Sequence, residues 1–393
     1  MSQRAYLPVL GIVNALGGDA DTVAAALFAG DTSGMLLEEH WLPSGPARVG
    51  RARGALPALP ARFAAYDCRN NRLLLAALAQ IEATVDAMLG RYGRARVGSV
   101  LGTSTSGIAE GEAALAAYRA TGTLPDGYRY TQQGIGMPAV FLARYLGLRG
   151  PAYTVSTACT SSAKAFASAR ELLRHDFCDA VLVGGVDSLC RLTINGFTAL
   201  ESTTTSLSNP MSRNRRGINI GEGAALFLLT RDEAAVELLG IGESSDAHHI
   251  SAPHPAGSGA EAAMRAALAD AGLTDSAVDY LNLHATATPR NDEMESRAVA
   301  RVFPQGVAAS GTKPLTGHTL GAAGATELAF CWLALRDGRL PPHLWDGVVD
   351  PELPRLDLIG GERHFARSRG RVCMSNSFAF GGSNASLLIG DAR

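Results

Sequence analysis

Apolar runs of strand length alternate with longer Ala- and Leu-rich stretches along most of the chain. The apolar runs predict buried strands at 96–103, 152–157, 180–187, 224–230, 238–242, 279–284, 371–375 and 385–390, after a first strand within 6–18. Helical spacing and strong helix formers predict helices at 70–89, 163–175, 260–271 and 321–335. Because strands that alternate with helices form mostly parallel sheets covered by helices, the pattern predicts an α/β fold.

Two segments of the chain have the same sequence pattern. Each places a polar stretch of small residues before a long apolar helix, STACTSSAKAFASARELL in the first half and TGHTLGAAGATELAFCWLAL in the second. Helices with so many small residues and so few charges are suited to burial between two sheets. We therefore predict an internally duplicated, five-layer α-β-α-β-α fold with two pseudo-symmetric halves, residues 1–236 and 237–393.

The composition excludes several broad classes of protein. Hydrophobic residues make up 47% of the 393 residues and charged residues 18%, which excludes a disordered chain. The net charge of −2 counts against a nucleic-acid binder, because neutralising phosphates requires an excess of basic charge. The chain contains no run of 18 apolar residues, so no membrane span is predicted. Six scattered cysteines without a CxxC pair are typical of a reducing compartment, so we expect a cytoplasmic protein.

Cys159 lies where a predicted strand passes into a predicted helix. A thiol at a helix N-terminus is close to free N–H groups and to the positive end of the helix dipole, which lower its pKa toward the thiolate. The N–H groups of such a turn also suit an oxyanion hole. A small buried cysteine is the alternative interpretation of this residue.

Two histidines occupy comparable turns. His284 ends the strand YLNLH, and His318 precedes the helix of TGHTLGAAGA. Either histidine alone is more often structural than catalytic, but together with Cys159 they indicate one site. The histidines at 248, 249 and 254 lie in a Ser/Pro/Gly-rich loop without acidic or cysteine support, so we expect no metal site there.

Lysine is almost absent from this chain, with 33 arginines against Lys164 and Lys313. A lysine that persists in such a composition is expected to be needed for its compact ammonium group. Lys313 precedes His318 by five residues, and Glu327 follows His318 by nine. We expect a buried pair of Lys313 and Glu327 to orient His318, whereas Lys164 is interpreted as an ordinary helical residue.

The segment SNSFAFGGSN lies between the last two predicted strands. Its phenylalanines, Phe378 and Phe380, flank Ala379, and two glycines give the backbone freedom. A hairpin with buried aromatic rings is one interpretation. A mobile loop whose phenyl ring gates a pocket is the other.

Taken together, these motifs resemble those of the elongating β-ketoacyl-acyl-carrier-protein synthases of the thiolase superfamily. The resemblance is carried by TACTSSA at the cysteine, HATATPRND at the first histidine, KPLTGHTLGAAGATE around the second and NSFAFGGSN near the C-terminus, in family order. It implies a thiolase-like fold, a dimer, and decarboxylative condensation of an enzyme-bound acyl group with malonyl-acyl carrier protein. It implies no metal and no cofactor, because the substrates are carried on the phosphopantetheine of acyl carrier protein.

The resemblance also implies a role for each matching residue. Cys159 matches the nucleophile that forms the acyl thioester, and His284 and His318 match the histidines that promote malonyl decarboxylation. Lys313 and Glu327 match the charged pair that supports the second histidine.

Other matches concern the oxyanion hole, the gate and the substrate arm. The N–H groups of Cys159 and Phe380 match the oxyanion hole, with Phe380 and its neighbour Phe378 at the gate. Thr286 and Thr288 match the threonines that hydrogen-bond the phosphopantetheine arm.

Two positions depart from the family pattern. Ala285 and Ala379 stand where the family usually has glycine, and an alanine at positive φ costs about 1–2 kcal/mol. The FAFGG and HATATPxND variants are more similar to ketosynthases of aryl-polyene or type II polyketide pathways than to fatty-acid housekeeping enzymes. In such a pathway, a heterodimer with a chain-length-factor-like partner is an expected assembly besides the homodimer.

Competing functions differ from this one in single residues. A non-catalytic chain-length factor lacks the nucleophile, a degradative thiolase uses a second cysteine in a C-terminal Cys-x-Gly turn, and an initiating synthase lacks the histidine of TGH.

Because acyl carrier proteins are acidic, the docking face is expected to be basic. Six arginines against Asp67 give residues 48–72 a charge of +5, so we predict docking through Arg62 and Arg69.

Overall fold

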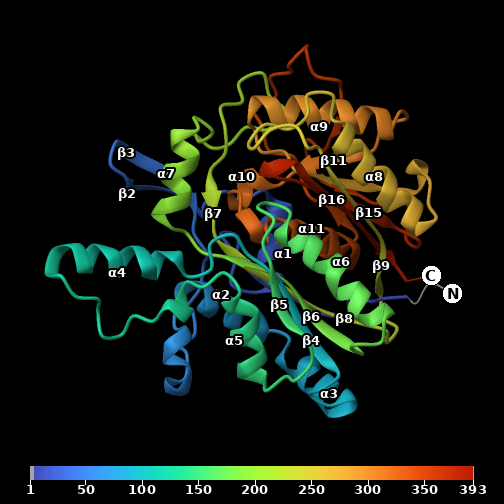
Figure 1. Ribbon diagram of the computed structural model, residues 1–393. Helices are drawn as coiled ribbons and strands as arrows, with labels where there is room; N and C mark the ends of the chain where they lie inside the picture. The colour runs from blue at the N-terminus through green and yellow to red at the C-terminus, as the bar shows by residue number, and fades with distance from the viewer. Residues whose placement is uncertain (1–3, 393) are drawn as a thin grey trace.

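The computed structural model describes residues 4–392, and their strands form two large sheets on either side of a shared helical layer (Figure 1). The first sheet has the strand order β1 (Leu10–Val13), β8 (Gly223–Thr230), β6 (Ala180–Asp187), β4 (Val97–Gly102) and β5 (Ala152–Val155). The second has the order β13 (Asp357–Leu358), β11 (Ala308–Gly311), β10 (Tyr280–Leu283), β15 (Val372–Phe378), β16 (Ser383–Asp391) and β9 (Val236–Ser245).

Both sheets are mixed, whereas the sequence pattern favoured mostly parallel sheets. In the first, β4 runs parallel to β5 and β6, but β8 runs antiparallel to β1 and β6. In the second, β10 runs parallel to β11 and β15, but β16 runs antiparallel to β15 and β9. Of these antiparallel pairs, only β15 and β16 are joined by a short turn, which an antiparallel pair allows; the other antiparallel neighbours, such as β6 and β8, are far apart in the chain.

Two helices separate the sheets, as the small-residue segments predict. These helices are α6 (Ser161–Arg174) and α11 (Ala323–Asp337), which pack against each other and against both sheets. Small residues are required at their contact, because a Cβ on Gly324 would lie 2.8 Å from the backbone nitrogen of Ala163. The central layer therefore depends on backbones that approach closely.

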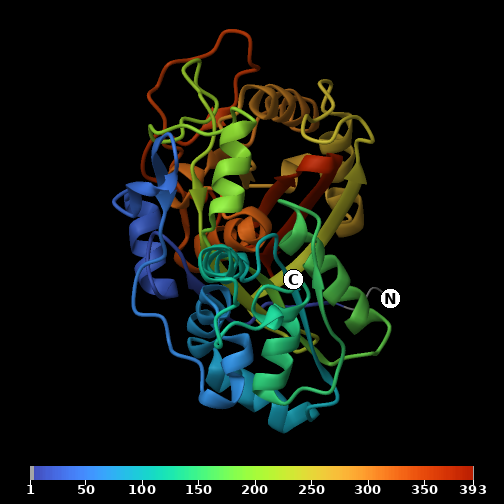
Figure 2. The ribbon, with the colours of Figure 1, turned by 60° about the vertical axis from the view of Figure 1, so that its left-hand side comes forward.

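The outer layers complete the thiolase-like, five-layer arrangement. α2 (Arg69–Ala79) and α5 (Met137–Leu146) cover the first sheet, and α8 (Ser258–Ala271) and α9 (Pro289–Val302) lie on the far side of the second. From top to bottom, Figure 1 shows α9 and α8, the second sheet, α11 and α6, the first sheet, and then α5. Figure 2 shows the same order of layers after a rotation of 60°.

One predicted helix is broken in two. The segment 70–89 forms α2 and α3 (Glu82–Tyr92), bent by 78° at the break. The side chain of Gln80 accepts from the backbone nitrogen of Ile12 and donates to the carbonyls of Ile12 and Gly18. These hydrogen bonds tie the break to β1 and the loop after it, so tertiary contacts override good helix propensity. Within residues 4–392, no single helix is long and apolar enough to cross a membrane; α2 and α3 pass that test only as a bent pair.

Several elements escaped the hydrophobic pattern because they are short or largely exposed. They are α1 (Ala20–Ala29), β2 (Met35–Leu42), β3 (Gly45–Gly50), α4 (Ile108–Thr121), α7 (Arg191–Ala199), β7 (Ile220–Gly221), α10 (Lys313–Thr316), β12 (Arg339–Leu340), β14 (Arg363–His364) and the short 3-10 turns η1 (Ala61–Tyr66), η2 (Tyr130–Gln132), η3 (Asp275–Ala277), η4 (Leu320–Ala322) and η5 (Phe380–Gly382). Of these, α10, η4 and η5 lie at the site described next.

Candidate active site

Cys159 lies in the turn between β5 and α6, as the sequence predicts. Its neighbour Ala158 has φ +52°, a left-handed conformation that turns the chain sharply before the helix. The hydroxyl of Ser161 accepts from the Thr157 nitrogen at 2.9 Å and donates to the Ala158 carbonyl. The thiol is therefore held on a short, internally bonded turn, with only 5% of the residue exposed.

His318 approaches Cys159 from the other half of the chain. Its Nε2 lies 3.0 Å from the Cys159 Sγ. The backbone of His318 bonds to the first half on both sides, donating to the Asn219 carbonyl and accepting from the Gly221 nitrogen. The contact between thiol and imidazole is thus fixed by the packing of one half against the other.

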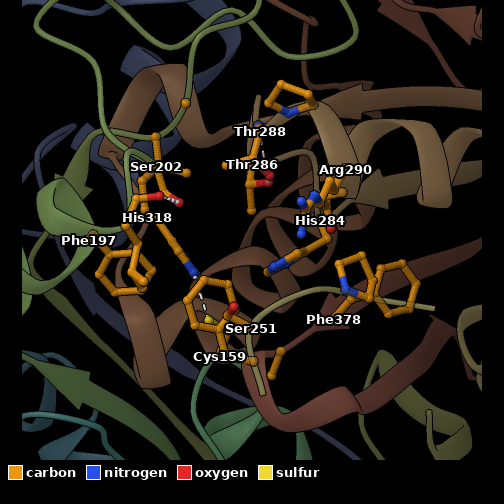
Figure 3. A pocket seen from close by; sticks show the side chains of 18 of the residues that line it. Cys159, Phe197, Ser202, Ser251, His284, Thr286, Thr288, Arg290, His318 and Phe378 are labelled. Carbon is orange, nitrogen blue, oxygen red and sulfur yellow. Dashed lines mark hydrogen bonds between the residues drawn. The ribbon is translucent and has the colours of Figure 1, made fainter. Parts of the chain in front are cut away.

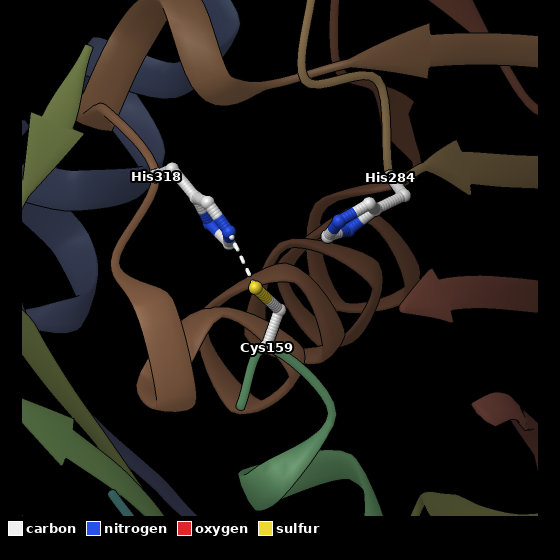
Figure 4. A group of neighbouring side chains, drawn as sticks. All are labelled: Cys159, His284 and His318. Carbon is white, nitrogen blue, oxygen red and sulfur yellow. Dashed lines mark hydrogen bonds between the residues drawn. The ribbon is translucent and has the colours of Figure 1, made fainter. Parts of the chain in front are cut away.

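His284 completes a three-residue cluster (Figure 4). The rings of His284 and His318 are 5.4 Å apart and nearly perpendicular. One ligand-type atom each from Cys159, His284 and His318 lies within 4.8 Å of the others. The structure therefore brings together the nucleophile and both histidines that the sequence predicts.

Glu295 on α9 holds the His284 turn, and sequence reasoning missed it. Its carboxylate accepts hydrogen bonds from the backbone nitrogens of His284 and Ala285, both at 2.7 Å. Burial raises the pKa of Glu295 to about 7, against the lowering effect of these two N–H donors. The signal available in the sequence was an acidic residue on the apolar face of a helix beginning at Pro289.

Asp187 at the end of β6 also escaped notice. This fully buried carboxylate accepts from the Ser104 and Thr105 backbone nitrogens and from the Ala322 nitrogen at 3.0 Å. Ala322 lies in the turn that follows His318. Asp187 therefore links the first sheet to the turn that carries the second histidine.

Lys313 and Glu327 form a buried ion pair, but they support a different histidine from the one expected. The Lys313 ammonium lies 3.3 Å from Nδ1 of His284 and donates to the His284 carbonyl and to Glu327. His318, closer in sequence, has a buried Nδ1 without a hydrogen-bond partner among the described residues. The expectation that this pair orients His318 was wrong, because α10 directs the lysine toward the end of β10.

The electrostatics of the cluster are dominated by burial. Burial, followed by the Lys313 charge, lowers the pKa of both histidines well below the usual value, so the imidazoles are neutral. Burial raises the pKa of the Cys159 thiol to about 12, although Lys313 and the Phe380 N–H act in the opposite direction. The sequence-based expectation of a lowered thiol pKa was therefore wrong: desolvation outweighs the helix N-terminus.

The cluster lies in a cavity of about 380 Å³ (Figure 3). Thr286 and Thr288 line it with hydroxyl groups 2.8 Å apart. Phe378 and Phe380 line another part of the wall. The cavity thus contains the predicted nucleophile, both histidines, both threonines and both phenylalanines.

The two positions at which alanine stands in place of the family's usual glycine differ in backbone conformation. Ala379 has φ −112°, an extended conformation open to any residue, so no strain arises there. Ala285 has φ +38° and carries the strain expected for alanine. Gly311 on β11 makes room for its methyl group, because a Cβ there would lie 2.4 Å from the Ala285 Cβ.

The arginine-rich segment is less basic in three dimensions than in sequence. Arg51 pairs with Glu38, Arg53 with Asp31 and Arg72 with Asp67. Arg69 makes two hydrogen bonds to Glu222, whose side chain is fully buried. Arg62 remains exposed, with its guanidinium 4.9 Å from the ring of Phe63. Arg69 therefore belongs to the interior network, and Arg62 is the predicted docking residue that stays accessible.

The histidines of the loop after β9 are held by local contacts. The His248 and His254 rings meet edge to face at 5.0 Å, and Nδ1 of His249 accepts from backbone nitrogens of its own loop. Ser251 of this loop lines the cavity, and the Ile250 carbonyl accepts from the Gly381 nitrogen. This loop thus contacts the turn that carries Phe380.

Comparisons with known proteins agree with this geometry. The family of β-ketoacyl synthase N-terminal domains matches residues 69–235, and that of the C-terminal domains matches residues 235–345. Nodulation protein E of Rhizobium sp. (strain N33) is 34% identical over 99% of both chains, and 3-oxoacyl-[acyl-carrier-protein] synthase 2 of Coxiella burnetii is 30% identical over 98% of both.

Solved structures extend the comparison to the fold. The ketosynthase ApeO, in complex with its chain length factor ApeC from Xenorhabdus doucetiae, superposes with a TM-score of 0.95 at 44% identity, over 99% of this chain and 98% of that one. A β-ketoacyl synthase from Burkholderia phymatum superposes with a TM-score of 0.87 at 30% identity over all of both chains. The chain therefore belongs to the β-ketoacyl synthase family.

Proposed function

We propose that Cys159 carries the acyl group of a decarboxylative condensation and that His284 and His318 act on the malonyl group. The observation that carries the proposal is the 3.0 Å contact of the Cys159 Sγ with a neutral His318, beside His284 in a buried cavity. The product is a β-ketoacyl-acyl carrier protein.

The first step is an exchange of thioesters. The sulfur of Cys159 attacks the acyl carbonyl, the bond from that carbonyl to the carrier sulfur breaks, and the proton of the Cys159 thiol passes to the departing carrier thiolate. Because burial keeps Cys159 a thiol, we propose that His318 Nε2 accepts its proton during the attack. The N–H of Phe380, which hydrogen-bonds the sulfur, and that of Cys159 would hold the carbonyl oxygen.

The second step forms the carbon–carbon bond. Loss of CO₂ from the malonyl carboxylate leaves an enolate, whose oxygen His284 and His318 would stabilise with N–H donors, His318 being then in the tautomer that carries its proton on Nε2, the opposite of the one that accepts the thiol proton. The enolate carbon then attacks the carbonyl of the Cys159 thioester, the bond from that carbonyl to Sγ breaks, and the released Cys159 thiolate takes up a proton from solvent. Neutral imidazoles suit this task, because a preorganised donor in a dry site contributes about 3–4 kcal/mol to the transition state.

The supporting residues act through His284. Lys313, itself held by Glu327, contacts the ring and the carbonyl of His284, and Glu295 holds its backbone nitrogen. We propose that no metal or organic cofactor takes part, since the Lys313 ammonium beside His284 opposes a divalent cation at the cluster.

We propose that acyl carrier protein is the substrate carrier and that Thr286 and Thr288 contact its phosphopantetheine arm. Among relatives, 3-oxoacyl-[acyl-carrier-protein] synthases carry that partner in their name. We propose that Arg62 contributes to docking, whereas Arg69 is occupied by Glu222. Arg62→Glu should raise the KM for the carrier-bound substrate with little change in kcat; an unchanged KM would remove Arg62 from the docking face.

A second ketosynthase-like chain is the proposed structural partner. β5 forms the edge of the first sheet and is only half-buried, and such an edge is a template for pairing with another strand. ApeO is in complex with a chain length factor, which supports a heterodimer and, with it, a polyketide or aryl-polyene pathway. Light scattering of the protein expressed alone and together with a chain-length-factor-like ketosynthase from the same source would separate a homodimer from a heterodimer.

Two alternatives disagree with the site. A chain-length factor would lack the nucleophile, but Cys159 is in place and contacts His318. A thiolase would place a second cysteine in the C-terminal turn, where this chain has Phe380, Gly381 and Gly382. Among the described residues, Cys159 alone of the cysteines lines the cavity.

The test is mass spectrometry of the protein after incubation with a panel of acyl carrier thioesters. We expect acylation of Cys159 and its loss in Cys159→Ser, together with loss of condensation. Cys190→Ser is the matched control, since Cys190 is buried away from the cavity. The proposal is contradicted if no donor acylates Cys159 or if Cys159→Ser condenses at the rate of the parent enzyme.

A further inference from the structure

Arg290 lies in the wall of the active-site cavity and has no assigned role. It is the second residue of α9, is exposed, and lines the cavity beside Thr288 (Figure 3). Within residues 4–392 its side chain makes no ion pair, hydrogen bond or ring contact. By contrast, Arg301 on the same helix is paired with Glu261. The guanidinium of Arg290 is therefore available to a ligand.

The residues before Arg290 form a graded series from the interior to the surface. His284, Thr286, Thr288 and Arg290 alternate along the chain, and all line the cavity. His284 is 1% exposed and Thr286 7%, Thr288 is half-buried, and Arg290 is exposed. Ala285 and Ala287, with left-handed backbones, are fully buried between the members of the series. The series presents an imidazole, two hydroxyls and a guanidinium in order of decreasing depth.

This order of groups matches the order of groups along a phosphopantetheine arm. The arm ends in the reacting thioester, continues through two amides, and joins its carrier through a phosphodiester anion. Hydroxyls are partners for amides, and a guanidinium forms charge-assisted, two-pronged hydrogen bonds with phosphate oxygens. Resting on the proposed function, we propose that Arg290 binds the phosphate of the phosphopantetheine arm.

The other charged group of the cavity strengthens this assignment. Among the described residues that line it, Glu201 is the one carboxylic acid and Arg290 the one guanidinium. Glu201 follows α7 and is exposed at the same cavity. A phosphate is repelled by Glu201 and attracted by Arg290, so the arm is drawn to the wall that carries the two threonines.

The experiment measures transfer of an acyl group to Cys159 from three donors that share one acyl chain: acyl-acyl carrier protein, acyl-phosphopantetheine and acyl-pantetheine. We compare the full-length protein with Arg290→Gln and, as a matched loss of charge on the same helix outside the cavity, Arg297→Gln. Arg290→Gln should raise the KM about tenfold for the two donors that carry phosphate and less than about twofold for acyl-pantetheine, with kcat unchanged. Arg297→Gln should leave all three values unchanged.

Other outcomes overturn the assignment. An equal effect on acyl-pantetheine makes Arg290 a determinant of cavity shape, an effect confined to the carrier protein makes it a contact for the protein surface, and no effect removes it altogether. The double variant Arg290→Gln with Glu201→Gln restores the net charge of the cavity, and it should remain impaired; recovery of the KM would show that only the overall field matters. If no donor acylates Cys159 even in the parent protein, the proposed function itself fails.

Discussion

The ammonium of Lys313 lies 3.3 Å from Nδ1 of His284 and also donates to the carbonyl of that residue. Its counter-ion is the buried Glu327, and both side chains are almost completely excluded from solvent. Burial, followed by the Lys313 charge, keeps the His284 ring neutral, and the contact of the ammonium with Nδ1 orients the ring. His318 contacts the thiol without such support, so the two histidines depend on different parts of the structure.

Removing the ion pair should therefore separate the two chemical steps. Lys313→Met combined with Glu327→Gln leaves no unpaired buried charge, which alone would cost several kcal/mol. We expect malonyl decarboxylation to fall at least about a hundredfold and acyl transfer to Cys159 less than about tenfold. Rapid-quench assays of each half-reaction measure both rates.

Lys164→Met is the matched control, since Lys164 is the other lysine of the chain and pairs with Glu243 outside the cavity. It should change neither rate. Equal losses in both half-reactions of the double variant would contradict a role confined to His284.

The buried thiol predicts an unusual pH dependence of alkylation. Burial raises the pKa of Cys159 to about 12, so the fraction of thiolate increases with pH over the whole accessible range. The rate of inactivation by iodoacetamide should therefore rise from pH 6 to pH 10 without a plateau. A plateau below pH 8 would show that the thiolate is already formed in the resting enzyme.

The methyl groups of Ala285 and Gly311 compete for one space. Gly311→Ala would place its Cβ 2.4 Å from that of Ala285, and such overpacking costs about 1–3 kcal/mol of unfolding free energy. Adding Ala285→Gly removes the obstacle and should restore stability, whereas Ala285→Gly alone should stay within about 1 kcal/mol of the parent. Urea denaturation of the parent, the two single variants and the double variant measures the four unfolding free energies of a double-mutant cycle. Strictly additive changes in unfolding free energy would mean that the two positions do not interact.

Glu295 makes stability depend on pH through a raised pKa. The folded-state value of about 7 exceeds the unfolded value of 4.5, so the folded protein holds one more proton between these limits. Its contribution is therefore lost as pH rises from about 4.5 to 7, by at most about 3 kcal/mol. Glu295→Gln cannot titrate, so the difference in unfolding free energy between parent and variant should change across that window and be constant below it.

Glu295→Gln should also lower kcat, because a glutamine oxygen can accept from only one of the two nitrogens of the His284 turn. Matched denaturation curves at pH 4.5 and 7.5 measure the stability part. A pH-independent difference would mean that the pKa of Glu295 is the same in the folded and the unfolded protein.

Arg69 provides a prediction about stability rather than docking. Arg69→Glu sets a carboxylate against the fully buried Glu222 and should cost about 3–5 kcal/mol, whereas Arg62→Glu should be nearly neutral. Thermal unfolding compares them directly. Equal melting temperatures would mean that the pair with Glu222 contributes nothing to the fold.

The local pattern of the sequence was sufficient to predict much of the fold and of the candidate site. The strand 180–187 was predicted with the bounds that β6 has, because an uninterrupted apolar run suits a strand buried on both faces. The small residues of α6 and α11 likewise indicated two helices packed between sheets. The positions of Cys159, His284 and His318 at turns that bound buried elements pointed to one site, since the ends of neighbouring elements meet at the same edge of a fold.

Other features were decided only by tertiary structure. Gln80 breaks a helix of good propensity because its partners come from β1 and the loop after it. The charge of the arginine-rich segment is reduced by acids outside it, such as Glu222. Lys313 is closer in sequence to His318 but contacts His284, and burial raises the thiol pKa that the helix position alone would lower. Hydrophobic periodicity is a property of neighbouring residues, whereas ion pairing and desolvation depend on what packs around a group, which the linear order of residues does not contain.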